Sequence, residues 1–403
     1  MKLSEELAWR GFVNQTTLPN IEDINQPRTF YWGVDPSADS MTVGHLAPAM
    51  MIRHFMQHGH KAILLVGGAT GMIGDPDGKK QERTLKTIEE IATNKQALSE
   101  QYRTIFDGQT FDIVDNYDWF KDFNYLDFLR DVGKHAPMTQ MLDRDFIKNR
   151  IGAGGDGISY AEFSYSLIQG YDFLHLFKEK GATLQVAGAD QWGNSISGVQ
   201  LIRRIEGGEA HVWTTPLIIN KATGVKFGKS EAGAVWLDES KTSVYQFYQF
   251  WLNCDDESVI DFLKIYTMLS QETIEQLQQD VMNDPAKRKA QKTLAFEVTS
   301  LIHGHSRAEN ARNISAVLFG QTNFKDLLAE EIDMLALEIP TTESSHAMNA
   351  LVASGLATSN GDAKRLIEGG AVSINGEKIS EDRVLDAASL IKKGKNSFLL
   401  VNN

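Results

Sequence analysis

Cysteine is almost missing from this chain of 403 residues, and Cys254 is the one example. A single cysteine excludes an internal disulfide and any zinc site that needs several thiolates. Long apolar runs are missing as well. The longest purely aliphatic run covers residues 62–66, whereas a helix needs about 20 apolar residues to cross a bilayer. Residues 1–10 are charged and have no signal-peptide core, so we expect a cytoplasmic protein without a membrane partner.

An excess of positive charge is also lacking. The 40 Lys and Arg residues are outnumbered by 53 Asp and Glu residues, and the net charge is −13. This balance argues against a surface covered with basic patches for non-specific binding of nucleic acid. The charge is unevenly spread, because residues 346–403 hold seven basic and six acidic side chains. A weakly positive terminal module on an acidic body is compatible with a specific RNA contact.

The order of apolar segments predicts the fold class. Short apolar segments read as strands at residues 29–34, 62–66, 183–187 and 212–219. Amphipathic patterns between them predict helices, of which the clearest cover residues 46–58 and 87–106. Alternating strands and helices predict an α/β domain with a doubly wound parallel sheet. Glycine-rich polar segments follow two of these strands, and ligands bind at the carboxyl ends of such strands.

The pattern changes along the chain and divides it into four parts. Strand signals stop near residue 245, and long amphipathic helices such as 272–281 and 286–303 follow. Pro340 and small polar residues then mark a linker. We therefore predict a catalytic α/β domain at 1–244, an α-helical domain at 245–321, a linker at 322–345 and a small α+β module at 346–403.

Two distant segments carry chemistry suited to a triphosphate. Residues 35–45 (DPSADSMTVGH) join a predicted strand to a helix that should begin at residues 43–45, because Pro48 is tolerated only near a helix start. The first N–H groups of that helix are then available to a phosphate. Residues 226–230 (KFGKS) offer two lysines on a loop. Fixed dipoles and mobile cations together can stabilise charge on an α-phosphate and a departing pyrophosphate.

Two common phosphate loops are absent. A Walker A loop needs a glycine at position 73 and Ser or Thr at position 80, where the chain has Ile73 and Lys80. Gly68, Gly71 and Gly74 do not have the G-x-G-x-x-G spacing of a dinucleotide-binding turn, so a nicotinamide dehydrogenase is unsupported.

Five motifs in fixed order resemble the class I aminoacyl-tRNA synthetases, and among them the bacterial tyrosyl-tRNA synthetases. They are YWGVDPSADS at 31–40, VGGATGMIGDP at 66–76, YSLIQGYD at 165–172, GADQWGN at 188–194 and KFGKS at 226–230. The helical part and the terminal module also match, the latter being similar to a small ribosomal-protein-type RNA-binding domain. The resemblance implies a Rossmann-like catalytic domain, an anticodon-arm role for the helices and a homodimer.

The resemblance also implies the reaction. Tyrosine is activated with ATP to tyrosyl-adenylate and pyrophosphate, and then passes to the 3′-terminal ribose of tRNA(Tyr). ATP comes with Mg²⁺ as a co-substrate, and no tightly bound cofactor or dedicated metal site is expected.

Site residues follow from the same resemblance. For tyrosine, Tyr31 and Asp172 would hold the phenol hydroxyl, a strategy that rejects phenylalanine strongly; Tyr165, Gln169 and Asp75 would hold the ammonium group, and Gln191 would lie beside the carboxylate. The implied ATP-binding residues are Asp35, Ser37, Gly44, His45, Gly188, Asp190 and Lys229. The implied catalytic residues are Thr42, His45, Lys79, Arg83, Lys226, Lys229 and Ser230.

Three residues depart from the family pattern. Thr42 stands where the family usually has the first His of its HIGH motif. A lost transition-state donor costs up to about 3–4 kcal/mol, but Thr42 can still donate a hydrogen bond, so we expect activity to be retained. Ser37 keeps the hydroxyl of the usual Thr, and Trp32 replaces a small residue beside the ribose.

Three other functions remain as alternatives. The T-x-G-H pattern also resembles small nucleotidyltransferases, but those lack an extension like residues 245–403. A tryptophanyl-tRNA synthetase is disfavoured because Tyr31 with Asp172 suits a phenol better than an indole. A non-catalytic, RNA-binding relative of the synthetases is supported by Thr42 alone, and the lysines of the KFGKS segment oppose it.

Overall fold

The computed structural model describes residues 1–76, 85–142, 145–152, 157–219, 227–230 and 233–402. The chain folds into two compact units. The first unit comprises residues 1–242 and 254–294, and the second comprises residues 243–253 and 295–403.

A six-stranded sheet forms the centre of the first unit, in the order β1-β6-β5-β2-β3-β4. Its strands are β1 (Gln15–Thr16), β2 (Thr29–Val34), β3 (Lys61–Val66), β4 (Phe111–Asp115), β5 (Ala182–Gly188) and β6 (His211–Thr215). Strands β2 to β6 pair in parallel, and β1 pairs antiparallel with β6. The predicted parallel sheet is confirmed. The strand predicted at 212–219 ends at Thr215, because Pro216 lacks the N–H that would continue the ladder.

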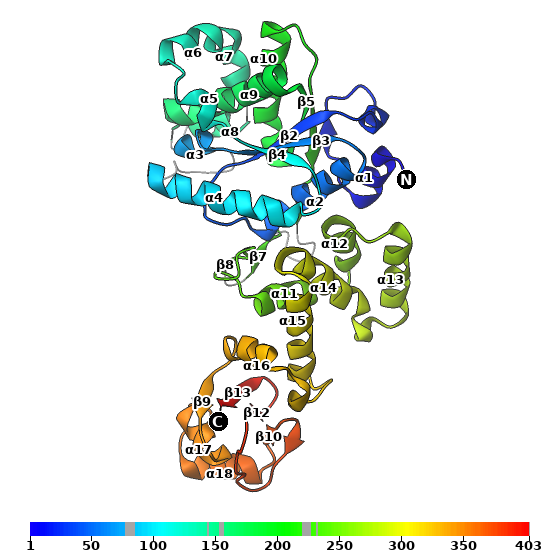
Figure 1. Cartoon of the computed structure of the whole chain (residues 1–403), viewed down its shortest axis with the longest axis vertical. Helices are drawn as coiled ribbons and strands as arrows, with labels where there is room; N and C mark the ends of the chain where they lie inside the picture. The colour runs from blue at the N-terminus through cyan, green and yellow to red at the C-terminus, as the bar shows by residue number, and fades with distance from the viewer. Residues whose placement is uncertain (77–84, 143–144, 153–156, 220–226, 231–232, 403) are drawn as a thin grey trace. The chain divides into compact units, whose positions relative to one another are not determined.

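Helices cover both faces of this sheet (Figure 1). Helices α2 (Val43–Gln57) and α4 (Ile88–Ile105) lie on one face, and α9 (Tyr160–Lys180) and α10 (Trp192–Ile205) lie on the other. Side-chain caps set several starts, as where the Ser159 hydroxyl accepts from the Glu162 amide at the start of α9. Helix α2 begins at Val43 as predicted, and Pro48 falls in its second turn.

Shorter helices complete the first unit. They are α1 (Leu3–Arg10), α3 (Thr70–Ile73), α5 (Tyr117–Phe120), α6 (Tyr125–Asp131), α7 (Met138–Leu142), α8 (Asp145–Ile151), α12 (Val259–Tyr266) and α13 (Gln271–Asn283). The 3₁₀ helices are η1 (Ile21–Asn25), η2 (Gly133–His135), η3 (Ala189–Gln191) and η4 (Pro285–Lys287). Strands β7 (Lys229–Ser230) and β8 (Gly233–Ala234) form a small antiparallel pair.

The second unit combines helices with a five-stranded sheet in the order β11-β10-β12-β13-β9. Its strands are β9 (Thr341–Glu343), β10 (Val372–Ile374), β11 (Glu377–Lys378), β12 (Ser389–Lys393) and β13 (Ser397–Asn402). Its helices are α11 (Val244–Leu252), α15 (His305–Leu318), η5 (Phe324–Asp326), α16 (Ala329–Ala336), α17 (Ala347–Ala353) and α18 (Asn360–Glu368), while α14 (Lys289–His303) spans the boundary at residue 294.

The segment 322–345, expected to be a linker, contains α16 and β9. Strand β9 pairs in parallel with β13. Leu335 of α16 is fully buried in a cluster that also holds Leu390 and Leu400. This segment is therefore part of the second unit's fold, because a partner strand and a shared core stabilise a stretch whose own composition resembles a loop.

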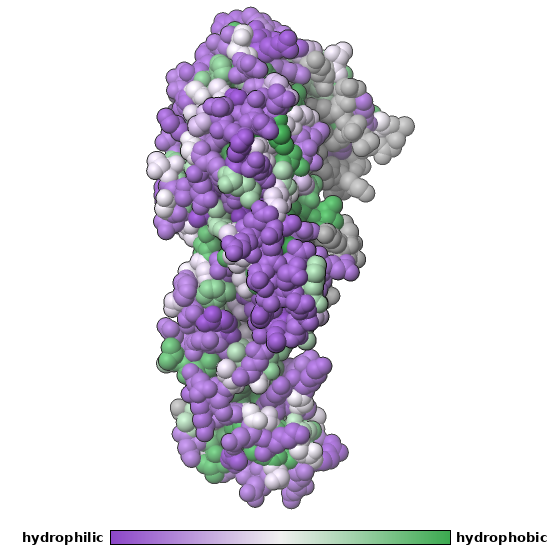
Figure 2. Space-filling model, turned by 90° about the vertical axis from the view of Figure 1, so that its right-hand side faces the viewer, coloured by the Kyte–Doolittle hydropathy of each residue, from purple (hydrophilic) through white to green (hydrophobic). Residues whose placement is uncertain are grey.

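One face of the molecule is mostly polar. The face in Figure 2 is dominated by hydrophilic residues, and hydrophobic residues form small separate areas on it. Within the described ranges, each helix is too short or too polar to cross a membrane.

Candidate functional site

The carboxyl ends of β2, β3 and β5 meet at one edge of the sheet, and the predicted site residues follow these strands. Asp35 follows β2, the turn at 67–69 follows β3, and Asp190 follows β5. This is the edge at which open α/β sheets bind ligands.

Asp35 follows β2, and its side chain contacts residues of α3 and α9. One carboxylate oxygen accepts a hydrogen bond from the Tyr165 hydroxyl at 2.7 Å, and the other accepts from the Thr70 hydroxyl at 2.6 Å. Gly67 lies so close that a Cβ there would overlap the side chains of Asp35 and Thr70. Burial raises the pKa of Tyr165, and the nearby carboxylates of Asp35 and Asp75 raise it further. Tyr165 is thus a protonated donor held in place by Asp35.

Tyr31 and Gln169 each carry a buried polar atom that no other described residue satisfies. Tyr31 is 2% exposed and packs against Phe173, with ring centroids 5.2 Å apart. Among the described residues, neither the Tyr31 hydroxyl nor the Gln169 amide oxygen has a hydrogen-bond partner. Burial and then the Asp172 charge raise the pKa of Tyr31, so its hydroxyl is a donor. Leaving such groups unpaired is unfavourable, so each of these two atoms can take a polar ligand.

Asp172 lies deep in the site and is 1% exposed. Its carboxylate accepts a hydrogen bond from the Asn116 amide at 3.1 Å and from the Trp119 indole N–H at 2.9 Å. Burial raises the pKa of Asp172 well above its usual range, and these two hydrogen bonds act in the opposite direction. The sequence interpretation missed Asn116 and Trp119. They follow β4, a five-residue edge strand that contains two Asp residues and has only a weak apolar pattern, so their place at the sheet edge was not recognised.

Asp75 and Gln191 come together across the site. The Gln191 amide donates to Asp75 at 2.6 Å, and its oxygen accepts from Asn194 at 3.3 Å. Gln191 ends η3 and immediately precedes α10. Asp190 is exposed in the same turn, and a Cβ at Gly188 would lie 2.7 Å from Asp190 Oδ1. Glycine at 188 thus keeps the space beside the Asp190 carboxylate open.

The TVGH segment forms the start of α2, with Thr42 as its N-cap. The backbone N–H of Thr42 donates to Nδ1 of His45 at 3.1 Å, and the Thr42 hydroxyl lies 3.1 Å from the same nitrogen. Because Nδ1 accepts a hydrogen bond, the proton of the neutral ring is on Nε2. Ser37 is exposed in the preceding turn, where its N–H donates to the Asp35 carbonyl at 2.7 Å.

The expectation that the first N–H groups of α2 are open to a ligand is wrong for three of them. Thr42 donates to His45, Val43 donates to the Val235 carbonyl at 3.0 Å, and His45 donates to the Thr42 carbonyl at 2.9 Å. Residues 235–237 run antiparallel to residues 41–43, and the Val235 carbonyl takes up the Val43 N–H. Such a pairing between distant segments has no local sequence signal.

Gly44 lies between the two predicted phosphate segments. A Cβ there would be 3.5 Å from the Thr42 hydroxyl and 4.0 Å from the Phe227 carbonyl. The KFGKS and TVGH segments are therefore neighbours, as the sequence predicts. The ring of Phe227 packs against Phe262 at 4.3 Å and against Tyr266 at 5.8 Å between centroids, which fixes the loop on α12.

The described residues do not include all of the predicted cations. Lys79, Arg83 and Lys226 lie outside them. The backbone of Lys229 and Ser230 forms β7, which pairs with β8. The predicted catalytic roles of these five residues therefore stay predictions.

Trp32 lies in the core. It is 4% exposed and packs against Tyr102 and Phe106, with ring centroids 5.4 Å and 6.3 Å away. Its indole fills space between β2 and α4, which accounts for a large residue at this position.

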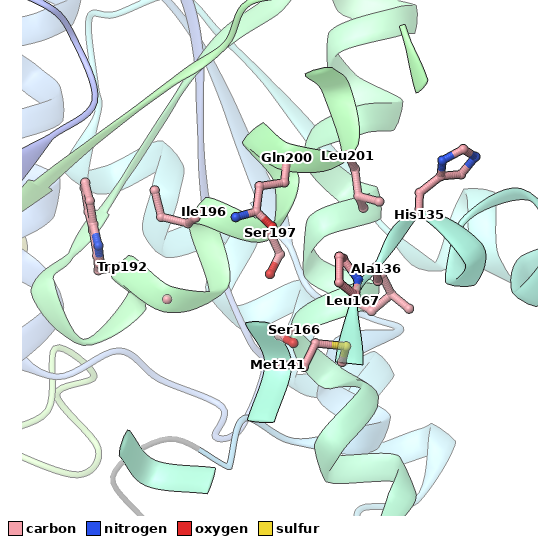
Figure 3. Close-up of a pocket in the computed structure, with 12 residues that line it drawn as sticks. His135, Ala136, Met141, Ser166, Leu167, Trp192, Ile196, Ser197, Gln200 and Leu201 are labelled. Carbon is pink, nitrogen blue, oxygen red and sulfur yellow. The ribbon is translucent and has the colours of Figure 1, made fainter. Parts of the chain in front are cut away.

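A separate hollow of about 180 Å³ lies between η2, α7, α9 and α10. Figure 3 shows Ser166 and Leu167 of α9 opposite Ser197 and Leu201 of α10. None of the predicted site residues lines it. Among the described residues that line it, His135 alone is ionisable, so this hollow is a poor match to a charged nucleotide.

Comparisons with known proteins cover the whole chain. The family model of class I tRNA synthetases (W and Y) matches residues 23–320, and that of the tyrosine--tRNA ligase SYY-like C-terminal domain matches residues 329–401. The tyrosine--tRNA ligase of Pediococcus pentosaceus is 44% identical in an alignment of 419 positions that covers 99% of each chain. Tyrosine--tRNA ligase 1 of Bacillus subtilis is 43% identical in an alignment of 423 positions that again covers 99% of each chain.

Solved structures agree with these sequence matches. The C-terminally truncated mitochondrial tyrosyl-tRNA synthetase of Aspergillus nidulans is 30% identical and has a TM-score of 0.71, covering 79% of this chain and 94% of that one. The equivalent protein of Coccidioides posadasii, also 30% identical, has a TM-score of 0.67 and covers 78% and 91%. With its parallel sheet, ordered motifs and full-length relatives, the chain belongs to the tyrosine--tRNA ligases, the class I aminoacyl-tRNA synthetases that use ATP to join tyrosine to its tRNA.

Proposed function

We propose that Tyr31 and Asp172 recognise the phenol hydroxyl of the substrate tyrosine. The observation that carries this assignment is the buried Tyr31 hydroxyl without a partner among the described residues. Its phenol can donate to the substrate oxygen, and the substrate hydroxyl can donate to Asp172. Phenylalanine would leave the buried Tyr31 hydroxyl unpaired and would give Asp172 no donor from the substrate, and such sites reject the analogue that lacks the hydroxyl by a large factor.

The ammonium group of the substrate belongs with Tyr165, Gln169 and Asp75 in this proposal. Gln169 supplies an amide oxygen without a partner among the described residues, and Asp75 supplies negative charge. Both are acceptors, as an ammonium group requires. Gln191 donates to Asp75 at 2.6 Å and so orients that carboxylate, while it lies beside the reacting carboxylate of the substrate.

Activation then proceeds by direct displacement. An oxygen of the tyrosine carboxylate forms a bond to the α-phosphorus of ATP, and the bond to the bridging oxygen of pyrophosphate breaks. His45 would donate from Nε2 to the phosphates, and Asp190 would accept from the ribose beside Gly188. Asp35, Ser37 and Gly44 border the nucleotide. Catalysis by positioned donors and cations, including Lys79, Arg83, Lys226, Lys229 and Ser230, needs no protein nucleophile.

In the second step, a hydroxyl of the terminal tRNA ribose attacks the tyrosyl carbonyl and AMP leaves. ATP enters as its magnesium complex, with the metal held mainly by the phosphates. Residues 346–403 would contact RNA, and their basic side chains include Lys364, Arg365, Lys392, Lys393 and Lys395.

We also assign the protein to the cytoplasm, in keeping with its single thiol, whose pKa burial raises to about 12. Cell fractionation tests this assignment.

A homodimer accounts for an apolar surface on the first unit. Tyr125, Leu126, Met138, Ile151 and Tyr160 are between 52% and 71% exposed, and they lie on α6, α7, α8 and α9. The hydroxyls of Tyr125 and Tyr160 lie 3.5 Å apart, and large exposed apolar patches are uncommon on monomers. Sedimentation at micromolar concentration should show a dimer, and Leu126→Glu should weaken it.

Leu337 provides the matched control for that experiment. It is 83% exposed in the second unit, so Leu337→Glu should leave the dimer intact. A wild-type monomer that still charges tRNA would overturn the proposal that the protein acts as a homodimer.

The assigned roles are tested by tyrosine-dependent exchange of labelled pyrophosphate into ATP, without tRNA. Tyrosine should support exchange, whereas phenylalanine and tryptophan should not. Tyr31→Phe and Asp172→Ala should each reduce the preference for tyrosine over phenylalanine. An unchanged preference in both variants would refute the assignment of the phenol site.

A further inference from the structure

His175 lies against the residue that holds Asp172. Its imidazole stacks on the Trp119 indole, with ring centroids 4.4 Å apart and an interplanar angle of 20°. The indole N–H of Trp119 in turn donates to Asp172 at 2.9 Å. Asp172 and His175 are both on α9, three residues apart and therefore on one face of the helix. One helix thus holds the edge of the indole through Asp172 and its face through His175.

Trp119 has little support from its own segment. Helix α5 is four residues long and contributes no fully buried residue. Trp119 is itself only partly buried against the core. A short helix at a sheet edge does not hold a large side chain in one rotamer by itself, so the stacked ring is an important constraint on the indole.

We propose that His175 is a positioning residue for tyrosine specificity, which holds the Trp119 indole in the orientation that directs its N–H at Asp172. This role rests on the proposed contact between Asp172 and the substrate hydroxyl. His175 touches neither the substrate nor the nucleotide in this arrangement. It acts through two contacts, first on the indole and then on the carboxylate.

The contact requires a flat ring rather than a charge. Offset stacking of two nearly parallel aromatic faces is favourable for neutral rings. Burial lowers the pKa of His175, and the adjacent Lys178 lowers it too, while Glu179 raises it. The ring is therefore neutral at pH 7 and above. A phenyl ring at this position should stack on the Trp119 indole in the same way, whereas a side chain without a ring should not.

The test compares His175→Ala, His175→Gln and His175→Phe in tyrosine-dependent pyrophosphate exchange. His175→Ala and His175→Gln should raise KM for tyrosine about 3- to 10-fold, the range that an aromatic stack accounts for. They should also lower the preference for tyrosine over phenylalanine and leave KM for ATP unchanged. His175→Phe should restore the wild-type values.

A matched control is Lys178→Ala on the same helix, whose side chain is 49% exposed and pairs with Glu206. It should change none of these constants. Wild-type constants in both His175→Ala and His175→Gln would overturn the proposal, as would an equal rise in KM for tyrosine and ATP. If His175→Ala folds poorly, the contrast between His175→Gln and His175→Phe decides the question.

Asp172→Ala separates this inference from the function on which it rests. If Asp172→Ala keeps the wild-type preference for tyrosine, the assignment of the phenol site fails. If Asp172→Ala loses the preference and the His175 variants keep it, the site stands and only the role of His175 is refuted.

Discussion

The imidazole of His45 turns back onto Thr42, with Nδ1 3.1 Å from the Thr42 backbone nitrogen and 3.1 Å from its hydroxyl. The backbone N–H alone is enough to make Nδ1 the acceptor and Nε2 the protonated nitrogen. Thr42 therefore orients the histidine of the T-x-G-H motif through its main chain, which any residue except proline would supply at position 42.

This geometry predicts that Thr42 and His45 differ strongly in importance. Thr42→Val removes only the hydroxyl contact and should slow adenylate formation less than about 10-fold, whereas His45→Ala removes a transition-state donor and should slow it about 100-fold or more. Pre-steady-state formation of tyrosyl-adenylate measures both. Thr42→His should give at most a small gain, and a large gain would mean that the natural enzyme is impaired at this position.

Tyr31→Phe should separate stability from activity. It removes a buried hydroxyl that has no partner among the described residues, so the protein without substrate should gain about 1 kcal/mol or stay unchanged. The same change should raise KM for tyrosine and lower the preference for tyrosine over phenylalanine about 10-fold or more. Thermal unfolding without tyrosine and pyrophosphate exchange are the two measurements. A clear loss of stability would show that the hydroxyl already has a partner in the free enzyme.

His60 should make the first unit less stable in mild acid. It is 4% exposed and packs against Phe55 and Phe30, and burial lowers its pKa to about 4. The neighbouring positive groups His58 and Arg28 act in the same direction, while a backbone hydrogen bond opposes them. The unfolded chain binds this proton below pH 6.5, but the folded chain does not until about pH 4. Stability should therefore fall by about 2–3 kcal/mol between these pH values.

His60→Phe tests this assignment because it keeps an aromatic ring and removes the titration. Its unfolding free energy should depend less on pH between 6.5 and 4 than that of the wild type. If the unfolding free energies of wild type and His60→Phe changed with pH in parallel, the acid sensitivity would belong to another group.

The sequence predicted the parts of the site that depend on local pattern. Tyr31 falls in the strand predicted at residues 29–34, because an apolar strand has a strong sequence signal. The helix start at Val43 was also predictable, since Pro48 restricts where a helix can begin.

What the sequence did not show depends on contacts between distant segments. Asn116 and Trp119 were missed because β4 is an edge strand with a weak apolar pattern. The pairing of Val43 with Val235 was missed because a backbone hydrogen bond does not depend on which side chains the two residues carry. Trp32 was placed beside the ribose by resemblance, but residues on β2 alternate between faces, and its side chain packs under α4.

Phe227 should anchor the KFGKS segment without touching the substrate. Its ring packs on Phe262 and Tyr266 of α12, and its backbone N–H donates to the Ile218 carbonyl at 2.8 Å. Phe227→Ala removes the ring and with it the contact that holds this backbone against α12. Because small displacements at a reacting centre can cost about 100-fold, we expect adenylate formation to slow about 10- to 100-fold. KM for tyrosine should not change, since the phenol site is formed by β2 and α9.

Phe262→Ala removes the opposite partner of the same contact and should reproduce the effect. The double variant should be little slower than either single variant, because residues that share one contact are not additive. Phe227→Met keeps an apolar side chain that can adapt to the space and should retain most of the rate. Single-turnover adenylate formation at saturating tyrosine measures all four proteins. If the two alanine variants multiplied their effects, Phe227 and Phe262 would act independently, and the loop would be held by contacts other than this ring pair.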